Sequence, residues 1–271
     1  MKTDLHIHST FSDGSDSIEE LIALAQQRGL DAIAITDHDT VAHIDYLNSR
    51  AELPMKVLAG VELSAIHRPT STRAHILGYH LAHPEVITEL AQPLLEARNA
   101  NSEKQLECLV QLGYSIDVDK LARADGKYLY KQHIMDWLVS TGQAADMFGS
   151  FYHKTFKQGG PCDFDIEYID VYDAVRAIKE AGGLAVLAHP GKQHNFWLIA
   201  ELAKVGLDGV ELNHHSHSEH DQEVIQLYAE QQGLFLTGGS DHHGRFEPQP
   251  FGVGDFLSHP SGVRALALDA L

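Results

Sequence analysis

Short motifs rich in histidine and carboxylate recur along this chain, and each adjoins an apolar run that is typical of a β-strand. Imidazole nitrogens and carboxylate oxygens bind Mn, Fe and Zn, whereas many structural zinc sites take cysteine thiolates. A barrel with such residues at the ends of successive strands gathers them into one pocket. We therefore predict a pocket that holds several divalent metals. The motifs are His6-Ile-His8, Thr36-Asp-His38-Asp39, Gly60-Val-Glu62, Ala188-His189-Pro-Gly191 and Ser240-Asp241-His-His243.

The first motif places two imidazoles on one face of a strand. His6 and His8 are two residues apart, and side chains at that spacing point to the same side. Two adjacent imidazoles form a bidentate clip for a metal. Glu62 ends the third expected strand, and its two oxygens can bridge two metals. Asp241 and His243 follow the last expected strand with the same two-residue spacing.

Other candidate ligands depend more on their surroundings. Asp13 lies in a Ser-Asp-Gly turn, where an aspartate serves equally well as a turn former or as a ligand. His38 stands between Asp37 and Asp39, and a carboxylate beside a metal-bound histidine can orient its ring. The remaining candidates near strand ends are His75, His80 and His189.

Apolar runs and capping signals predict an alternating β/α fold. Ser17 and Glu20 form a capping box for a helix that ends at Gly29. Strands that alternate with helices predict a parallel sheet. Short apolar strands followed by polar loops favour a closed barrel whose active site lies at the C-terminal strand ends. The expected strands are 3–7, 31–35, 57–61, 74–79, 184–187, 209–212 and 234–237.

A long central stretch of the chain has few strand-like runs. It shows helical patterns over residues 86–112 and 131–141, so we predict a mostly helical insertion at 83–165. Residues 1–82 and 166–271 then form the metal-binding barrel. The later helices of the barrel are expected at 171–180, 196–205, 218–232 and 261–271.

The chain of 271 residues carries 38 acidic and 20 basic side chains, a formal charge of -18. Affinity for nucleic acid depends largely on lysine and arginine at phosphates, so this charge argues against a long nucleic acid as partner. A short anionic substrate held by metals remains compatible with it. The chain has two cysteines, Cys108 and Cys162, and shows neither a secretory signal nor an apolar run of about 20 residues. These features predict a cytoplasmic protein with no disulfide framework and no membrane contact.

The motifs together resemble the PHP (polymerase and histidinol phosphatase) family of amidohydrolase-like metalloenzymes. The likeness spans residues 3–82 and 170–258. It implies a distorted seven-stranded (β/α)7 barrel with two or three divalent metal ions, and seven is also the number of strands expected from the apolar runs. The motifs that carry the likeness are Asp4-Leu-His6-Ile-His8-Ser9, Ile35-Thr-Asp37-His38-Asp39, Gly60-Val-Glu62, His75-Ile-Leu-Gly-Tyr79, His189-Pro-Gly191 and Gly239-Ser-Asp241-His-His243.

The resemblance also implies which side chains share each metal. Glu62 is expected to serve two of them, and His75 fits the family pattern better than His80. The expected ligand sets are His6, His8, Glu62 and Asp241 for the first metal, Glu62, His75 and His189 with a bridging water for the second, and Asp13, His38 and His243 for the third.

Within the family, the helical insertion is similar to that of small-nucleotide and cyclic-phosphate phosphoesterases and of a 5′-to-3′ exoribonuclease group. Histidinol phosphatases usually lack it. Many relatives have Arg-Pro-His where this chain has Lys131-Gln132-His133, and arginine commonly follows His-Pro-Gly where this chain has Lys192. Lysine binds phosphate as a point charge and not as a planar fork, so these positions bear on substrate preference.

The reaction implied by the resemblance is hydrolysis of a phosphoester. A hydroxide that bridges two metals forms at neutral pH and attacks phosphorus in line, while the metals neutralise the non-bridging oxygens. The leaving alcohol then needs a proton. The candidates for phosphate contact or acid catalysis are Lys192, His133 and His217, followed by Lys131 and His194.

We expect the substrate to be a small phosphorylated compound, namely a nucleotide such as a 3′,5′-bisphosphate. One alternative is an exonuclease on short RNA or DNA, which needs a basic track beyond the metal pocket. Another is a histidinol-phosphatase-like phosphomonoesterase. A non-catalytic binding domain would have lost ligands, and this set is intact. A carbon–nitrogen amidohydrolase would typically carry a carbamylated lysine or a glutamate at mid-barrel, and no lysine follows a strand suitably here.

Overall fold

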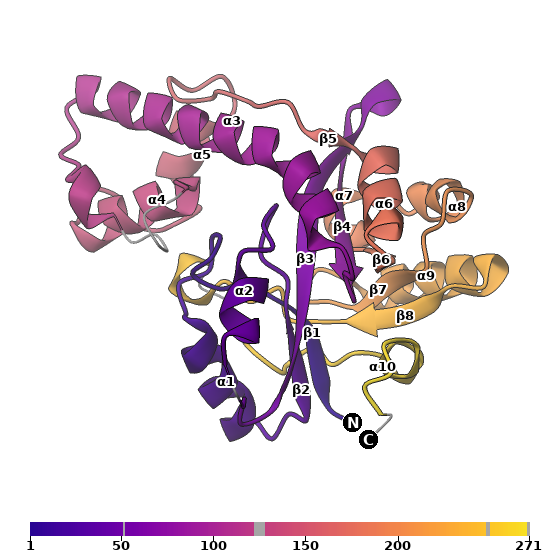
Figure 1. The fold of residues 1–271 in the computed structure, drawn as a ribbon. Helices are drawn as coiled ribbons and strands as arrows, with labels where there is room; N and C mark the ends of the chain where they lie inside the picture. The colour runs from indigo at the N-terminus through magenta and orange to yellow at the C-terminus, as the bar shows by residue number, and fades with distance from the viewer. Residues whose placement is uncertain (51, 122–127, 248–249, 270–271) are drawn as a thin grey trace.

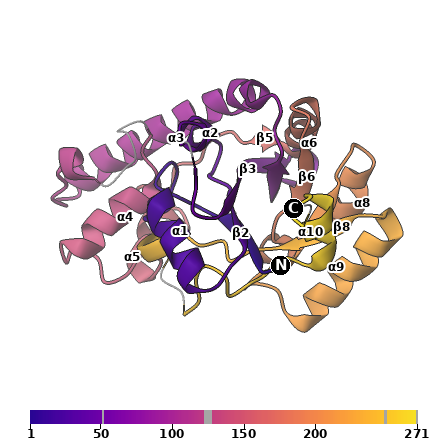
Figure 2. The same cartoon turned by 60° about the horizontal axis from the view of Figure 1, so that its bottom comes forward.

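The computed structural model describes residues 1–50, 52–121, 128–247 and 250–269. Within these ranges, seven strands form one curved, nearly closed sheet with helices on its outside (Figures 1 and 2), and a short further strand, β5 (Ile169–Asp170), pairs with β3. This confirms the expected distorted seven-stranded α/β barrel. In spatial order the strands are β1 (Thr3–Ile7), β2 (Ala32–Ile35), β3 (Lys56–His67), β4 (Thr72–Tyr79), β6 (Leu184–Leu187), β7 (Gly209–Asn213) and β8 (Phe235–Gly238).

The sheet is not wholly parallel, so the expectation drawn from strand–helix alternation was wrong for one strand. β4 runs antiparallel to both of its neighbours, β3 and β6. A single 3-10 turn, Arg68–Thr70, joins β3 to β4, and so short a link suits antiparallel neighbours. The pairing carries β3 on to His67, so Glu62 lies within the strand, opposite Leu77, and does not end it.

The barrel closes through the segment that follows β8. The backbone N–H of Asp241 donates to the carbonyl of His6 over 2.9 Å, and that of His8 donates to the carbonyl of His242 over 3.0 Å. These hydrogen bonds extend a parallel bridge between Ile7 and His242. As a result, the first and last ligand motifs of the chain lie side by side.

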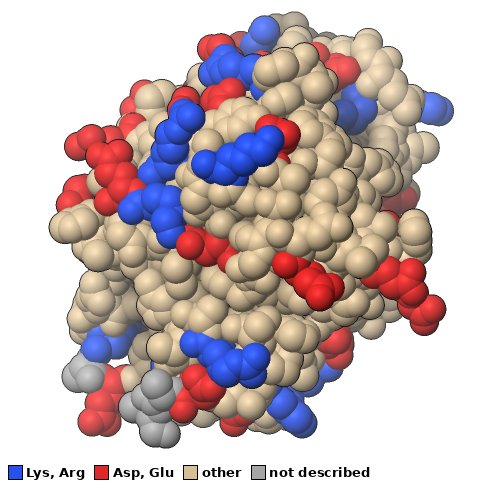
Figure 3. Space-filling view, turned by 90° about the vertical axis from the view of Figure 1, so that its right-hand side faces the viewer, with Lys and Arg blue, Asp and Glu red and all other residues tan. Residues whose placement is uncertain are grey.

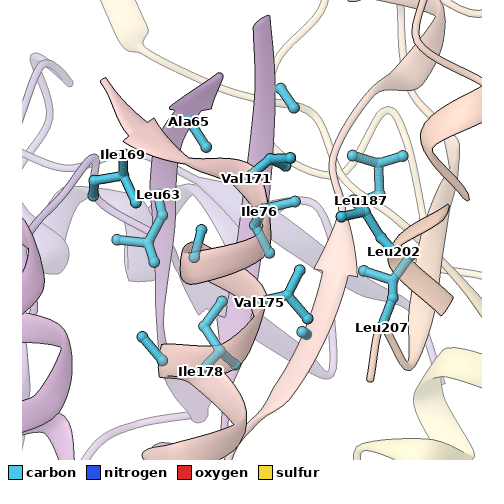
Figure 4. Close-up of a cluster of buried hydrophobic side chains, with 14 of the residues drawn as sticks. Leu63, Ala65, Ile76, Ile169, Val171, Val175, Ile178, Leu187, Leu202 and Leu207 are labelled. Atoms are coloured by element: carbon cyan, nitrogen blue, oxygen red, sulfur yellow. The ribbon is translucent and has the colours of Figure 1, made fainter. Parts of the chain in front are cut away.

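The main hydrophobic core lies between the β3–β4 hairpin and helix α6 (Val171–Glu180), as Figure 4 shows. Leu63 and Ile76 are paired across the hairpin and fully buried against Val175 and Ile178 of the helix. Successive side chains of a strand point to opposite faces, so the residues beside Leu63 and Ile76 face the barrel interior. Those neighbours include two of the expected ligands, Glu62 and His75.

Helix α3 (Pro84–Gln111) begins against the barrel and extends away from it (Figure 1). Its first half contacts α6, whereas Leu106 and Leu109 in its second half join a separate apolar cluster with Ile134 and Leu138. The described residues between 84 and 156 form helices and turns and no strand, in line with the expected helical character. The division of the chain at 83 and 165 stays a prediction. The helices of this region are α3, α4 (Lys131–Ser140) and α5 (Ser150–Phe156).

The remaining helices flank the barrel strands. The expected capping box is present, because Ser17 and Glu20 exchange hydrogen bonds at the start of α1. Residues 270–271 of the expected terminal helix lie outside the described residues. In the described ranges, no helix is both long and apolar enough to cross a bilayer. These helices are α1 (Ile18–Gln27), α2 (His43–Asn48), α7 (Pro190–Gln193), α8 (Trp197–Ala203), α9 (Glu219–Gln232) and α10 (Pro260–Ala265).

Candidate metal centre and adjoining pocket

Glu62 is the centre of the candidate site, and its two carboxylate oxygens face different histidines. Oε1 lies 2.8 Å from His75 Nδ1 and 2.9 Å from His189 Nε2. Oε2 lies 3.1 Å from Nε2 of both His6 and His8. Glu62 itself is completely buried. This division places the oxygens of one carboxylate between the ligand sets expected for the first and second metals, whereas metal ligation itself stays a prediction.

Asp241 completes the group around the Oε2 side of Glu62. Its Oδ1 lies 3.3 Å from His6 Nε2 and 3.2 Å from His8 Nε2. The residue adopts a φ of 52°, a left-handed conformation that is uncommon outside glycine, and aspartate is one of the residues that accept it. The turn after β8 thus aims the carboxylate back into the barrel.

A third group lies beside the first two. The ligand atoms of His8, Asp13, His38 and His243 all lie within 4.8 Å of one another. Asp13 Oδ1 is 3.6 Å from His243 Nε2, and its Oδ2 accepts a hydrogen bond of 2.7 Å from Gln132 of α4. All nine expected ligands are therefore brought together, and the helical region contacts this third group directly.

The donor set fits divalent cations. His6 Nε2, His8 Nε2 and Glu62 Oε2 are buried without a hydrogen bond among the described residues, although they converge within 3.1 Å. Orphaned buried polar atoms are costly unless another group satisfies them. A cation between nitrogen and oxygen donors would satisfy all of them, and the absence of sulfur in this set suits Mn, Fe or Zn.

The electrostatics of the site follow the same logic. Burial would raise the pKa of Glu62, yet the positive charge of His38, His6 and His75 outweighs it and holds that pKa well below its usual value. Burial would lower the pKa of His8, but the close carboxylates of Asp241 and Glu62 raise it to about 10. Protons on His6 and His8, whose pKa values are both raised, thus balance part of the buried carboxylate charge, and a divalent cation would take their place.

The carboxylates that flank His38 do not orient its ring, in contrast to the expectation. Asp37 turns toward hydroxyl groups of the loop after β1. Asp39 instead pairs with Arg98 of α3 over 2.6 Å and accepts a hydrogen bond from the backbone of Ser64 over 2.7 Å. The His38 ring lies 3.5 Å from the Ser64 hydroxyl. The alternative ligand His80 is directed away from the site, because its Nε2 contacts the carbonyl of Leu266.

One buried residue at the site, Glu211, escaped the sequence analysis, and another, His214, was expected only as one member of a histidine-rich run at 213–217 that borders the mouth. Glu211 on β7 contacts the His6 ring, and burial would raise its pKa, but the charge of His6 lowers it to about 2. His214 lies 3.4 Å from Asp241 through its Nε2. A signal for Glu211 was present, since Gly-Val-Glu-Leu occurs twice, at 60–63 and at 209–212. In both copies the glutamate lies inside an apolar strand, which indicates that Glu62 and Glu211 both face the barrel interior.

A cavity of about 320 Å³ adjoins the centre where the barrel meets the helical region. It reaches the metal ligands through His75. Burial, followed by repulsion from nearby Lys157, lowers the pKa of the Lys131 ammonium to about 8. The walls combine cationic and aromatic side chains. They include Arg98, Lys131, Lys157, Tyr152, Phe164 and Tyr168.

Of the three residues expected to contact phosphate or act as an acid, one reaches the centre. Lys192 Nζ lies 2.8 Å from Asp241 Oδ2 at the mouth. His217 has both ring nitrogens engaged with backbone, one with Leu212 O and one with Gly191 N. His133 is buried in the helical region, where its Nδ1 accepts from the backbone before α4. This geometry supports Lys192 and gives no support to substrate contact by His217 or His133.

Comparison with known proteins agrees with this geometry. The PHP domain profile matches residues 4–250. The chain is 42% identical over 255 residues to a phosphoribosyl 1,2-cyclic phosphate 1,2-diphosphodiesterase of Eggerthella lenta, covering 92% of this chain and 97% of that protein. It is 31% identical over 255 residues to a 3′,5′-nucleoside bisphosphate phosphatase of Chromobacterium violaceum, with 89% and 86% covered. It is also 30% identical over 275 residues to a 5′-3′ exoribonuclease of Escherichia coli, with 97% and 92% covered.

Solved structures show the same architecture. A Chromobacterium violaceum amidohydrolase with bound sulfate and no metal superposes with a TM-score of 0.84 at 27% identity, covering 99% of this chain and 96% of that one. A Bifidobacterium adolescentis protein superposes with a TM-score of 0.87 at 27% identity, covering 98% and 95%. The match extends over nearly the whole chain, barrel and helical region alike. The chain belongs to the PHP domain family of metal-dependent phosphoesterases.

Proposed function

We propose that this phosphoesterase hydrolyses a small phosphorylated sugar or nucleotide that carries a second phosphate, such as a nucleoside 3′,5′-bisphosphate. The observation that carries the proposal is the continuity of the site. His75 belongs both to the set of residues around Glu62 and to the wall of the cationic cavity. A substrate held in the cavity therefore places a phosphate at the metal ligands.

Nine side chains are proposed to hold two or three divalent ions of Mn, Fe or Zn. When bound, such ions stabilise charge on the phosphoryl oxygens and lower the pKa of water at neutral pH. Glu62 would position the ions, because its carboxylate lies between His75 and His189 on one side and His6 and His8 on the other. The proposed ligands are His6, His8, Asp13, His38, Glu62, His75, His189, Asp241 and His243.

The cavity supplies the features that a second phosphate and its sugar or base require. Lys131 and Lys157 both line the cavity and repel each other, and an anion bound beside them would offset that repulsion. Aromatic walls suit a sugar or base face. Two relatives have names that specify a bisphosphate or a phosphoribosyl cyclic phosphate, and both compounds carry a phosphate away from the reacting one. We propose that Lys131 contacts this distal phosphate.

Lys192 is proposed to act at the other end of the substrate. Lys192 lies on α7, three residues after His189, and its Nζ contacts Asp241 from the mouth of the site. An ammonium at this position can contact the phosphoryl group and assist the departing alcohol. Since lysine acts as a point charge, it leaves the orientation of the phosphate to the metal ligands.

Exonucleolytic cleavage of short RNA is the second candidate, because relatives of 29% to 31% identity are named as 5′-3′ exoribonucleases. The charge of -18 counts against it. On the face seen in Figure 3, lysine and arginine side chains lie beside acidic ones and do not form a continuous basic track. An RNA chain would gain little affinity from the mixed charges of this face.

Two readouts with the Mn-loaded protein test both candidates: release of inorganic phosphate from the small compounds and release of mononucleotides from the RNA. The panel has four compounds: a nucleoside 3′,5′-bisphosphate, the nucleoside monophosphate that lacks its second phosphate, the phosphomonoester formed by ring opening of phosphoribosyl 1,2-cyclic phosphate, and a 5′-phosphorylated RNA oligonucleotide. We expect turnover of at least one compound with two phosphate groups and a lower kcat/KM for the monophosphate. Higher kcat/KM for the oligonucleotide than for every small compound would overturn the proposal.

A further inference from the structure

Glu211 is a fully buried carboxylate beneath the candidate metal ligands. It lies on β7, in the wall of the barrel, and both of its oxygens accept hydrogen bonds. Oε1 lies 3.1 Å from Nδ1 of the His6 ring, and Oε2 accepts the backbone N–H of His189 over 2.9 Å. One side chain therefore contacts His6 on β1 and His189 in the turn between β6 and α7, and both of these residues face Glu62.

The contact with His6 distinguishes the two nitrogens of that ring. Nε2 faces two carboxylate oxygens, one on Glu62 at 3.1 Å and one on Asp241 at 3.3 Å, and makes no hydrogen bond to any residue that the structure describes. Nδ1 faces the Oε1 atom of Glu211. A carboxylate next to Nδ1 keeps the proton there, which leaves the lone pair of Nε2 directed at the centre.

The contact with His189 acts on the backbone. His189 has a φ of 26°, outside the regions that non-glycine residues favour, at the end of β6. A residue keeps such a conformation only where its surroundings impose it. The hydrogen bond from His189 N to Glu211 is one such constraint, and it directs the side chain so that Nε2 lies 2.9 Å from Glu62 Oε1.

We propose that Glu211 is a positioning residue that sets the tautomer of His6 and the backbone of His189, so that both present Nε2 to the metals. This inference rests on the proposed metal role of these two histidines. It assigns to Glu211 no contact with substrate and none with a metal. Its predicted effect is on metal affinity, and on turnover only through the metal.

Glu211→Gln is the variant that tests the proposal. Glutamine keeps the shape of the side chain but offers one acceptor oxygen and an NH2 donor to two N–H groups. Either His6 or His189 is therefore left facing a donor. We expect the affinity for the tightest Zn²⁺ or Mn²⁺ ion, measured by chelator competition, to fall about 10- to 100-fold.

Asp208→Asn is the matched control. Asp208 precedes β7 and is a carboxylate that pairs with Lys179 over 2.6 Å and accepts the backbone N–H of Ala185 over 2.8 Å. It lies at the other end of the strand from the metal ligands. We expect this variant to lower the unfolding midpoint and to keep the metal affinity of the wild type.

The wild-type protein provides a measurement that does not depend on a variant. In the Zn-loaded protein, ¹H–¹⁵N correlation spectra of the histidine rings should show His6 bound through Nε2 with a protected Nδ1–H. Failure of the wild type to bind Zn²⁺ or Mn²⁺ would refute the proposed metal centre itself. Two other results would overturn the role of Glu211 and leave the metal centre standing. One is metal binding by the wild type with unchanged affinity in Glu211→Gln, and the other is metal binding by the wild type with the His6 proton on Nε2.

Discussion

Replacing Lys131 with methionine should stabilise the folded protein and weaken substrate binding at the same time. The ammonium lies in the cavity between the barrel and the helical region, with Nζ 5.3 Å from the ring centre of Phe156 and 5.7 Å from that of Tyr152. Methionine has a similar length and packs well against aromatic rings. The change therefore removes a charge from a half-buried site without leaving a large void.

The size of the stability effect follows from the pKa of Lys131. Burial and repulsion from Lys157 lower it from 10.5 to about 8, which corresponds to about 3 kcal/mol against the charged form. Because the folded pKa is depressed, the unfolded chain binds more protons between these two values, and wild-type stability rises with pH across this window. The advantage of Lys131→Met should be about 3 kcal/mol at pH 7 and shrink by about 2 kcal/mol by pH 9.5.

Urea unfolding of both proteins at pH 7 and pH 9.5 measures this difference, and phosphate release measures the functional effect. Loss of a charge-assisted hydrogen bond of about 1.5–3 kcal/mol should raise KM for a substrate with two phosphates about 10- to 100-fold. The KM of a monophosphate should change little, because it lacks the distal group. Lower stability of the variant at pH 7, or an unchanged KM for the doubly phosphorylated substrate, would refute the reasoning.

Three further results are expected from the metal centre and the core. Asp241→Asn removes one oxygen that faces His6 and His8, so metal content measured by mass spectrometry and activity should fall together; full activity would contradict the site. Dialysis against a chelator should abolish activity, and free Mn²⁺ at 100 times its Kd should restore it and stabilise the fold by about 2.7 kcal/mol in thermal unfolding. Leu187→Ala leaves a void at a fully buried position on β6 and should lower the free energy of unfolding by about 2–5 kcal/mol, as measured with urea. The kcat of the Mn-loaded variant should stay close to that of the wild type. A large loss of kcat would show that the core controls the site geometry more tightly than proposed.

Much of the barrel could be predicted because its periodicities are local. The expected bounds of β1 and β6 coincide with the observed ones, and Ser17 and Glu20 cap α1 as anticipated. Each of these signals lies within a few consecutive residues, so no long-range contact is needed to read it. The antiparallel direction of β4 was missed because it depends on contacts that no local signal reveals. Strand direction depends on pairing partners, and Arg68–Thr70 gave no strong signal of a hairpin in the chain.

The helical region shows a similar limit. Its helices were expected, but the cavity exists only because α3, α4 and the segment before β5 meet beside His75. Arg98 stands in no recognisable motif, and its role becomes visible through the 2.6 Å contact with Asp39. His217 shows the converse. The run Asn213-His-His-Ser-His217 after an expected strand suggested a substrate contact, yet backbone groups occupy both ring nitrogens of His217.

Residue type and spacing along the chain were enough to select the expected ligands, because imidazole nitrogens and carboxylate oxygens are metal donors wherever they occur and the apolar runs show that they lie near strand ends. The fold alone shows that one oxygen of Glu62 faces His75 and His189 while the other faces His6, His8 and His38, and that Glu211 contacts the His6 ring. These facts depend on contacts between different strands, and some of them join residues far apart in sequence, such as the 127-residue separation of Glu62 and His189 and the 205-residue separation of His6 and Glu211. Local propensity specifies each strand, whereas closure of the barrel specifies which side chains meet.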